Sequence, residues 1–242
     1  MKGSPVLFTG PAAPFLFNER ETIMTTMIAT EIDTPEPVCS GWIYAYGLYQ
    51  PHWQIARHLN SDWSQAVMRA KRKSEVAIET FGRIIARHLE TVLLEEMEYV
   101  ITHVPAEEDK QLYLLDLPRC ATEALAACIH RHIGNHADVL LAGVLAQVKP
   151  KPHKQHQCTN DAERAENVKG VYAVTQSGLV WGKCVILVDD VLTSGATMRE
   201  CADMLRSAGA RSVMGIALAR TERMKAPSFT ADNDWETGDD AA

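Results

Sequence analysis

Two adjacent carboxylates, Asp189 and Asp190, are the residues of this sequence with the clearest capacity for chemistry. They follow the apolar run Val185–Val188, which is typical of a buried strand. Adjacent carboxylates repel each other unless a cation or hydrogen-bond donors lie near them. A role as strand-end turn residues would explain one aspartate but not both, so the pair predicts a ligand that satisfies the two carboxylates.

The next residues, Thr193–Thr197, predict an anion site beside this pair. Small residues let backbone N–H groups approach an anion, and a helix expected from Ala196 adds partial positive charge at its N-terminus. A Walker loop would need a lysine directly after the glycine, and Gly195 is followed by Ala196. Helix capping by Ser194 or Thr197 would explain only one hydroxyl. The two features together predict a ribose 5-phosphate group as ligand. The expected phosphate-binding residues are Thr193, Ser194, Gly195, Ala196 and Thr197.

Hydrophobic periodicity predicts the elements that position these residues. The expected strands cover residues 41–46, 99–105, 137–144, 171–174, 183–188 and 212–219, and the expected helices cover residues 61–92, 121–133 and 196–207. Apolar strands that alternate with helices form right-handed βαβ units. The predicted fold class is therefore α/β, with a mainly parallel sheet flanked by helices. Ligands of such sheets bind beyond the carboxyl ends of the strands, which places Asp189 and Asp190 at a cleft.

Composition and charge limit the remaining function classes. Of the 242 residues, 46% are hydrophobic and 23% are charged, and the acids after Thr230 carry most of the net charge of −7. The nearly neutral body that remains is a poor electrostatic match to a nucleic acid, so nucleic-acid binding by the isolated domain is not expected. The six cysteines are scattered without a Cys-x-x-Cys pair, so neither a disulfide framework nor a zinc ribbon is expected. No stretch has the length and apolarity of a membrane span, and a cytoplasmic protein without a membrane partner is predicted.

Three parts are expected along the chain. Residues 1–40 are predicted to be a disordered leader and linker, because prolines and a glycine interrupt the apolar run that a signal peptide would need. Residues 41–221 form the predicted domain, with a small hood over about residues 41–65. Residues 222–242 are predicted to be a disordered acidic tail. The aromatic residues of the hood segment either stack against a ring of the ligand or, as the favoured alternative, pack a small hydrophobic subdomain. These residues are Trp42, Tyr44, Tyr46, Tyr49 and Trp53.

Three further clusters of polar residues each have a structural and a functional interpretation. The run Lys71–Lys73 is expected to be a solvated face or a helix break rather than a ligand site. His130, His132 and His136 are expected on a solvent-facing helix surface. The basic stretch Lys149–Cys158 is predicted to fold over an anionic substrate, which is favoured over a metal site.

The motif from Val185 to Thr197 resembles the phosphoribosyl-diphosphate (PRPP) binding motif of type I phosphoribosyltransferases. That motif consists of four apolar residues, two acids, two apolar residues and then Thr-Ser-Gly-Ala-Thr. The wider sequence is similar to the ComF branch of the superfamily over about residues 41–221. Ala70-Lys71-Arg72 before a long helix and Val104-Pro105 after a strand are similar to features of that branch. The polar signature of the branch is matched by Gln157, Glu163, Arg164, Asn167, Gly170 and Tyr172.

The resemblance implies a function and a role for each matched residue. Asp189 and Asp190 are expected to accept the ribose hydroxyls of PRPP, directly or beside Mg²⁺, and residues 193–197 to hold the 5-phosphate. Lys71 and Arg164 are expected to bind substrate. The implied activity is a phosphoribosyltransferase of nucleotide metabolism, a glycosyltransferase that moves the phosphoribosyl group from PRPP to an acceptor and releases pyrophosphate. The motif does not specify the acceptor, and the prediction is compatible with a homodimer.

Two departures from the family pattern keep a second function open. The chain lacks the four-cysteine zinc module with which ComF proteins usually begin. The expected pyrophosphate-facing loop reads Ala106-Glu107-Glu108-Asp109-Lys110, and its acids would repel pyrophosphate. The alternative is a non-catalytic PRPP- or nucleotide-binding protein with a regulatory or DNA-uptake (competence-related) accessory role. The acidic loop favours this alternative, and the basic stretch after Lys149 favours the enzyme.

Overall fold

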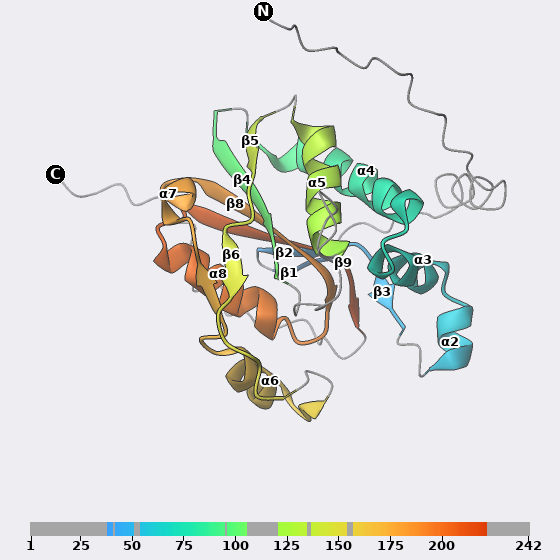
Figure 1. Cartoon of the computed structure of the whole chain (residues 1–242). Helices are drawn as coiled ribbons and strands as arrows, with labels where there is room; N and C mark the ends of the chain where they lie inside the picture. Colours follow the sequence, from blue (N-terminus) through green and yellow to red (C-terminus); the bar gives the residue numbers. More distant parts are fainter. Residues whose placement is uncertain are drawn as a thin grey trace, which may run out of the picture. The chain divides into compact units, whose positions relative to one another are not determined.

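The computed structural model describes residues 38–40, 42–50, 54–94, 96–105, 121–134, 137–153 and 157–221. Most of the expected leader, the acidic loop after Pro105, Trp53, His136 and the expected tail lie outside these residues. None of the helices in the described part of the chain has the length and apolarity needed to span a bilayer. The described elements belong to one compact unit (Figure 1).

The helices and strands alternate along the sequence as the periodicity predicts. The strands are β1 (Val38–Ser40), β2 (Ile43–Ala45), β3 (Leu48–Tyr49), β4 (Glu98–His103), β5 (Asp138–Leu141), β6 (Leu145–Gln147), β7 (Tyr172–Val174), β8 (Cys184–Leu192) and β9 (Ser212–Thr221). The helices are α2 (Ile55–Leu59), α3 (Asp62–Lys71), α4 (Glu75–Val92), α5 (Ala121–Ile133), α6 (Asp161–Val168), α7 (Ser177–Val180) and α8 (Ala196–Ser207).

A seven-stranded sheet forms the centre of the described residues, in the order β1-β2-β9-β8-β4-β5, with β3 also paired to β9. Strands β2, β3, β9, β8, β4 and β5 run parallel to their neighbours, and β1 pairs antiparallel with β2 at the edge. Strands β6 and β7 form a separate antiparallel pair. The prediction of an α/β fold with a mainly parallel sheet is confirmed.

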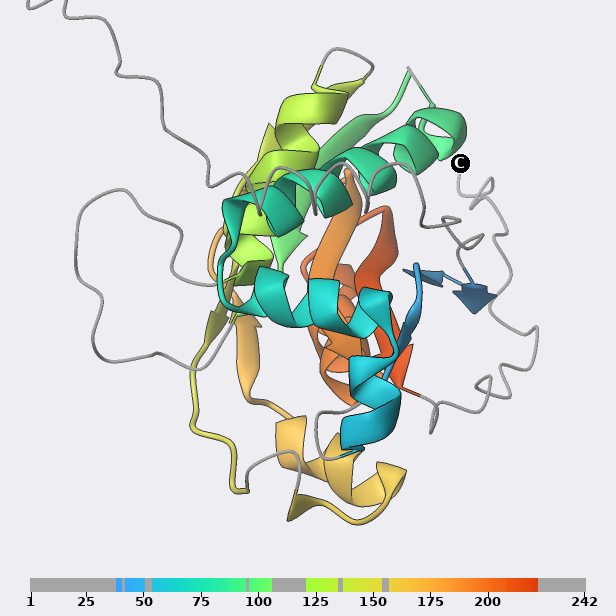
Figure 2. The same ribbon diagram turned by 90° about the vertical axis from the view of Figure 1, so that its right-hand side faces the viewer.

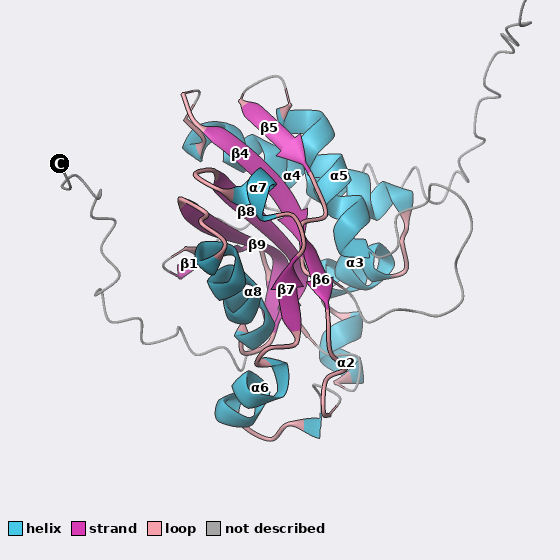
Figure 3. Ribbon diagram, turned by 60° about the vertical axis from the view of Figure 1, so that its left-hand side comes forward, coloured by secondary structure: helices cyan, strands magenta, loops and turns pink. Residues whose placement is uncertain are grey.

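Helices cover both faces of the sheet (Figure 3). Val185 and Leu187 of β8 share a buried cluster with Met198 and Leu205 of α8. Because successive side chains of a strand point to opposite faces, Ile186 points to the other face, where α5 packs on β4 and β8. Figure 2 shows α3 and α4 in front of the sheet on this second side. Each fully buried aliphatic side chain in these layers stabilises the fold by about 1.5–3 kcal/mol.

The single helix expected over residues 61–92 is two helices. Helix α3 begins after its N-cap Ser61, whose hydroxyl accepts a hydrogen bond from the Ser64 N–H, and it ends at Lys71. Lys73 then adopts a left-handed conformation with φ of 61°, and α4 starts at Glu75. Periodicity alone did not show this break because apolar residues continue at helical spacing on both sides of it. The expectation of a helix break in the basic run is confirmed.

The segment expected to form a hood belongs in part to the main sheet. Ile43 pairs with Gly215, and Leu48 pairs with Arg220, so β2 and β3 extend the parallel sheet beyond β9. Of the expected hood, only α2 and the start of α3 lie outside the sheet. The strand expected over residues 41–46 is therefore present but shorter, and it serves the core rather than a separate subdomain.

Candidate functional site

The aspartate pair lies within the second half of β8, not after the strand. Asp189 pairs with Ala217 of β9, and Leu192 with Arg220, so the ladder continues past both acids. Both residues are half-buried. The N–H of Asp190 donates to Oδ1 of Asp189 at 2.8 Å, and the N–H of Val191 donates to Oδ1 of Asp190 at 2.5 Å. Each carboxylate is thus oriented by the backbone of the residue that follows it.

Lys71 is brought to this pair from the end of α3. Its Nζ lies 3.1 Å from Oδ2 of Asp190, with side-chain exposures of 34% and 28%. The break at Lys73 ends α3 at this point and so fixes where the ammonium group can reach. Burial lowers the pKa of Lys71, but the charge and hydrogen bond of Asp190 outweigh burial and leave the pKa raised. Lys71 is therefore a charged partner of Asp190.

Asp189 is in the opposite electrostatic situation. Burial raises the pKa of its carboxyl group to about 7, and the neighbouring charge of Asp190 adds to the shift, against smaller opposing effects of the Asp190 N–H, Lys71 and Lys151. A raised pKa of this kind means that too few hydrogen-bond donors surround the carboxyl group to stabilise its ionised form. Hydroxyl donors or a cation from a ligand would supply what the protein does not.

The small-residue loop after β8 has the backbone that an anion cradle needs. Gly195 has φ of 73°, a left-handed conformation that favours glycine, and it caps α8 without a side-chain hydrogen bond. Ser194 is buried, and its hydroxyl accepts from the Ala196 N–H at 3.3 Å. Thr193 and Thr197 are half-buried. The predicted residues 193–197 therefore lie together at the N-terminus of a twelve-residue helix.

Arg199 is a cation at this loop that the sequence interpretation missed. Its Nη2 donates to the carbonyl oxygen of Ser194 at 2.8 Å. A Cβ atom added to Gly195 would lie 3.2 Å from Nη1 of Arg199. Side chains on a helix point back toward its N-terminus, so an arginine in the first turn of α8 was the available signal.

Tyr49 is a second neighbour of the site that was not assigned to it. Nζ of Lys71 lies 5.8 Å from the centre of the Tyr49 ring, and the Tyr49 hydroxyl donates to Sδ of Met68 at 3.0 Å. Burial raises the pKa of Tyr49, Lys71 lowers it and Asp190 raises it. Strand β3 thus supplies an aromatic wall beside the Lys71–Asp190 pair.

The structure does not place Arg164 in contact with the aspartates. The side chain is buried in α6, and its Nη2 donates to the carbonyl oxygen of Cys158 at 3.5 Å. Asn167 accepts from the His153 N–H at 2.8 Å and donates to the His153 carbonyl at 2.9 Å. The Gly170 N–H donates to Oε1 of Glu200 on α8 at 2.6 Å. These signature residues hold the two ends of the basic segment, and substrate binding by Arg164 stays a prediction.

Most of the described aromatic residues of the expected hood pack within the domain. Tyr46 is buried and its hydroxyl bonds to Nδ1 of His88 at 2.5 Å. Tyr44 contacts the same imidazole edge-on, with ring centres 4.9 Å apart, and Arg206 lies 4.8 Å from the Trp42 ring centre. The favoured alternative, packing rather than stacking of an acceptor, fits these three residues. An open surface depression of about 440 Å³ is lined by Leu48, Gln50, Ala56, Arg57, Asn60 and Ser61.

Chains similar to this one are found among solved structures, at low sequence identity. No curated protein sequence matches the chain. Two crystal forms of a hypoxanthine phosphoribosyltransferase from Staphylococcus aureus are similar, both at 13% identity. Their TM-scores are 0.36 and 0.42, and the similarity covers 59% and 64% of this chain and 62% and 69% of that chain. A glutamine PRPP amidotransferase from B. subtilis is similar at 20% identity and a TM-score of 0.33, over 57% of this chain and 26% of that chain. In the first of these structures, this chain therefore spans less than two thirds of the relative's length.

The family comparison covers the part of the chain that holds the aspartate pair and the small-residue loop. Residues 125–235 match the phosphoribosyl transferase domain family. Asp189, Asp190 and residues 193–197 lie inside this range, whereas Lys71 and Tyr49 precede it and join the site only through the fold. This part of the chain is therefore similar to phosphoribosyl transferase domains.

Proposed function

We propose that this protein binds PRPP together with Mg²⁺ and transfers the phosphoribosyl group to an acceptor, with release of pyrophosphate. One observation carries the proposal: a strand–loop–helix unit presents the aspartate pair Asp189–Asp190 directly before a left-handed glycine at a helix N-terminus. The pair suits the two ribose hydroxyls, and the loop suits a phosphate. A single ligand with both groups would fill the site.

The binding roles follow from the charge at each end of the unit. The ribose hydroxyls donate to the carboxylates of Asp189 and Asp190, and charge-assisted hydrogen bonds of this kind are each worth about 1.5–3 kcal/mol. The 5-phosphate accepts from the backbone N–H groups of residues 193–197 and from the threonine hydroxyls. The Arg199 guanidinium stabilises the loop by donating a hydrogen bond to the Ser194 carbonyl oxygen. The hard oxygen donors of the aspartate pair fit Mg²⁺, which neutralises pyrophosphate charge when bound.

The proposed reaction needs positioning and charge rather than a covalent protein nucleophile. The C1′–O bond to pyrophosphate breaks, and its electron pair leaves with the pyrophosphate. The acceptor, a base or amine, forms the new bond to C1′ and gives its proton to solvent. Lys71 contributes a positive charge near the ribose when it swings from Asp190 toward the anionic substrate.

The surface depression lined by Leu48 and Gln50 is a candidate place for the acceptor. It lies within the 41–65 segment expected to select the acceptor, and its lining offers amide, hydroxyl and guanidinium groups.

The second candidate is a PRPP- or nucleotide-binding regulatory or DNA-uptake accessory protein without turnover. The Lys71–Asp190 ion pair favours it, because one carboxylate is already engaged and must exchange its partner to accept a hydroxyl. Pyrophosphate release in the presence of PRPP, Mg²⁺ and a panel of bases and amines separates the two candidates. Tight PRPP binding without any release of pyrophosphate would favour the second.

The test of the PRPP site is the double substitution Asp189→Asn with Asp190→Asn. It keeps the shape of both side chains and removes their charge, so PRPP affinity measured by calorimetry should fall at least about tenfold, which is about 1.4 kcal/mol. Gly195→Val should also weaken binding, because the loop conformation and the approach of the phosphate are both lost. Thermal melts show whether each variant is folded.

The matched control is Asp203→Asn, which removes an acid from the exposed side of α8 where Asp203 pairs with Arg206. This variant should bind PRPP as the parent protein does. A folded double variant with the affinity of the parent would rule out the aspartate pair as the ribose site.

A further inference from the structure

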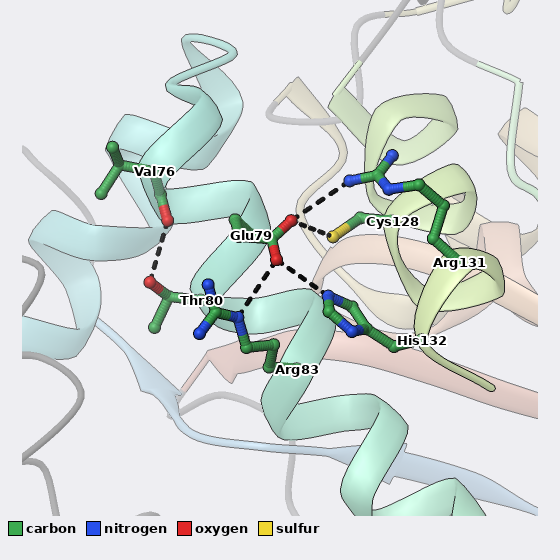
Figure 4. A network of polar contacts seen from close by, with 7 residues as sticks. All are labelled: Val76, Glu79, Thr80, Arg83, Cys128, Arg131 and His132. Carbon is green, nitrogen blue, oxygen red and sulfur yellow. Dashed lines mark hydrogen bonds and ion pairs between the residues drawn. The ribbon is translucent and has the colours of Figure 1, made fainter. Parts of the chain in front are cut away.

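A cluster of metal-ligating side chains lies between α4 and α5 (Figure 4). Glu79 of α4 points at Cys128 and His132 of α5. The Cys128 thiol donates to Oε2 of Glu79 at 3.2 Å, and Nε2 of His132 lies 2.9 Å from Oε1 of Glu79. One ligand atom from each of these three residues lies within 4.8 Å of the other two. His132, which was expected on a solvent-facing surface, is partly exposed, and its ring also bonds to Glu79 of α4.

The two helices are built to bring these groups together. Cys128 and His132 are four residues apart and therefore share one face of α5. On α4, Gly82 permits the close approach, since a Cβ atom there would lie 2.3 Å from the Cys128 sulfur. Cys128 is buried, and the Glu79 and His132 side chains are 34% and 32% exposed. The Cys128 thiol of the cluster is thus shielded from solvent, whereas the Glu79 and His132 side chains remain partly accessible to it.

We propose that Glu79, Cys128 and His132 form a site for Zn²⁺ or a similar borderline-soft divalent metal ion. A thiolate, an imidazole nitrogen and a carboxylate oxygen are the ligand types that zinc prefers, and three protein ligands leave a fourth position for water. Zinc bonds of about 2.0–2.3 Å place tetrahedral ligands about 3.5 Å apart. The Cys128 sulfur and His132 Nε2 contact different oxygens of the Glu79 carboxylate, at 3.2 and 2.9 Å. Because the three ligand atoms all lie within 4.8 Å of one another, each pair needs to close by about 1.3 Å at most to reach this spacing.

Metal binding must replace the partners that Glu79 has in this structure. Arg83 and Arg131 each place a guanidinium nitrogen 3.1 Å from the carboxylate, and their side chains are 59% and 63% exposed. Exposed arginines can turn into solvent at small cost. The Cys128 thiol gives its proton to solvent as its sulfur binds the metal, and His132 binds as neutral imidazole through Nε2. The arginines therefore oppose the metal electrostatically without blocking it.

This site is separate from the proposed PRPP site. Its ligands lie on α4 and α5, and the aspartate pair and the small-residue loop lie on β8 and α8. Failure of metal binding would leave the PRPP proposal untouched, and failure of PRPP binding would leave the metal proposal untouched.

The experiment is a Co²⁺ titration of the full chain after dialysis against a chelator. The parent protein should bind one Co²⁺ with a thiolate-to-metal charge-transfer band, and Zn²⁺ should displace it. Cys128→Ser should abolish the band, and His132→Gln should weaken binding at least tenfold. Cys158→Ser is the matched control, since Cys158 is also buried but lies next to the basic segment. It should leave the band and the affinity unchanged.

Arg131→Gln provides a variant in which the proposal predicts a gain. Removing one opposing cation should strengthen Co²⁺ binding several-fold, which a merely damaged protein would not do. The proposal is overturned if the parent gives no thiolate band, or if the band survives in Cys128→Ser. Loss of the band in the Cys158→Ser variant would move the site to the basic segment and would overturn it as well.

Discussion

Two carboxylates of this domain, Glu79 and Asp189, have their pKa values moved in opposite directions. Burial acts to raise the pKa of Glu79, but hydrogen bonds from Cys128, His132 and Arg83 outweigh it and lower the pKa to about 2. Burial also raises the pKa of Asp189, to about 7, and there the nearest charged neighbour is a second acid. Glu79 accepts hydrogen bonds from several side chains, whereas Asp189 accepts one from the backbone N–H of Asp190.

The difference separates a carboxylate whose charge is balanced by groups of the protein from one whose charge is not. Glu79 joins α4 to α5 through partners on both helices, so its charge is satisfied before anything binds. Asp189 receives one backbone N–H and faces Asp190, so its charge destabilises the empty site. Residues that bind ligands often reduce stability in this way, because the site is complementary to the ligand rather than to itself.

The largest expected effect is the loss of stability on Glu79→Gln. The amide group would place N–H donors against the donors of Cys128, Arg131 and His132, so the free energy of unfolding should fall by about 2 kcal/mol. Urea denaturation at pH 7 measures this difference. Arg83→Gln is the control, because this exposed cation one helical turn away is worth about 0.5 kcal/mol or less. Equal stability of Glu79→Gln and the parent would show that Glu79 does not join the helices energetically.

Asp189→Asn should have the opposite sign and a somewhat smaller size. At pH 8 the ionised Asp189 carboxylate lies beside Asp190 and destabilises the parent protein. The variant should therefore be more stable by about 1 kcal/mol, and it should bind PRPP less tightly. The pKa of Asp189 is higher in the folded than in the unfolded protein, so the folded state binds more protons between about pH 4 and pH 7. Its favourable contribution is complete below about pH 4 and is lost as the pH rises to about 7.

The pH dependence provides the check on Asp189. Urea midpoints at pH 5 and pH 8 should show that the parent loses more stability than Asp189→Asn over this interval. Glu79 does not contribute to the difference, because its stabilisation is lost only as the pH falls from about 4.5 toward 2. Parallel curves for the two proteins would contradict the assignment of a raised pKa to Asp189.

The fold was largely predictable from the sequence because its signals are local. Helices α5 and α8 have the predicted bounds, and Gly209 follows α8 with φ of 91°, as a residue after a helix end often does. The sequence left a solvated face and a helix break as alternatives at the α3–α4 junction, and the place of β2 and β3 in the main sheet was not predictable. The first depends on one left-handed lysine, Lys73, and the second on pairing with β9, which is distant in the sequence.

The two candidate sites also differ in how far the local sequence predicts them. The aspartate pair and residues 193–197 are contiguous, so their types and order already indicated a ribose phosphate ligand. Cys128 and His132 share one face of α5, but Glu79 is 49 residues from Cys128, so only the packing of α4 on α5 brings Glu79 to them. Lys71 lies between these cases: the sequence singled it out by its neighbours, but only the fold places it 3.1 Å from Asp190.

The smallest expected stability effect is that of Lys71→Gln, which tests whether Lys71 belongs to the site or merely to the surface. A half-exposed ion pair is worth about 0.5 kcal/mol, so the stability should change little. The affinity for PRPP should nevertheless fall several-fold, because the variant lacks the positive charge that Lys71, which lies beside Asp190, is proposed to bring to the anionic substrate. Lys183→Gln is the matched control, since Lys183 pairs with Glu98 at 2.9 Å and has a similar exposure of 29%. Both variants should show similar urea midpoints, and only Lys71→Gln should show weaker binding in calorimetry. If the two lysine variants bind PRPP equally well, Lys71 is a surface cation that neutralises Asp190 and has no part in the site.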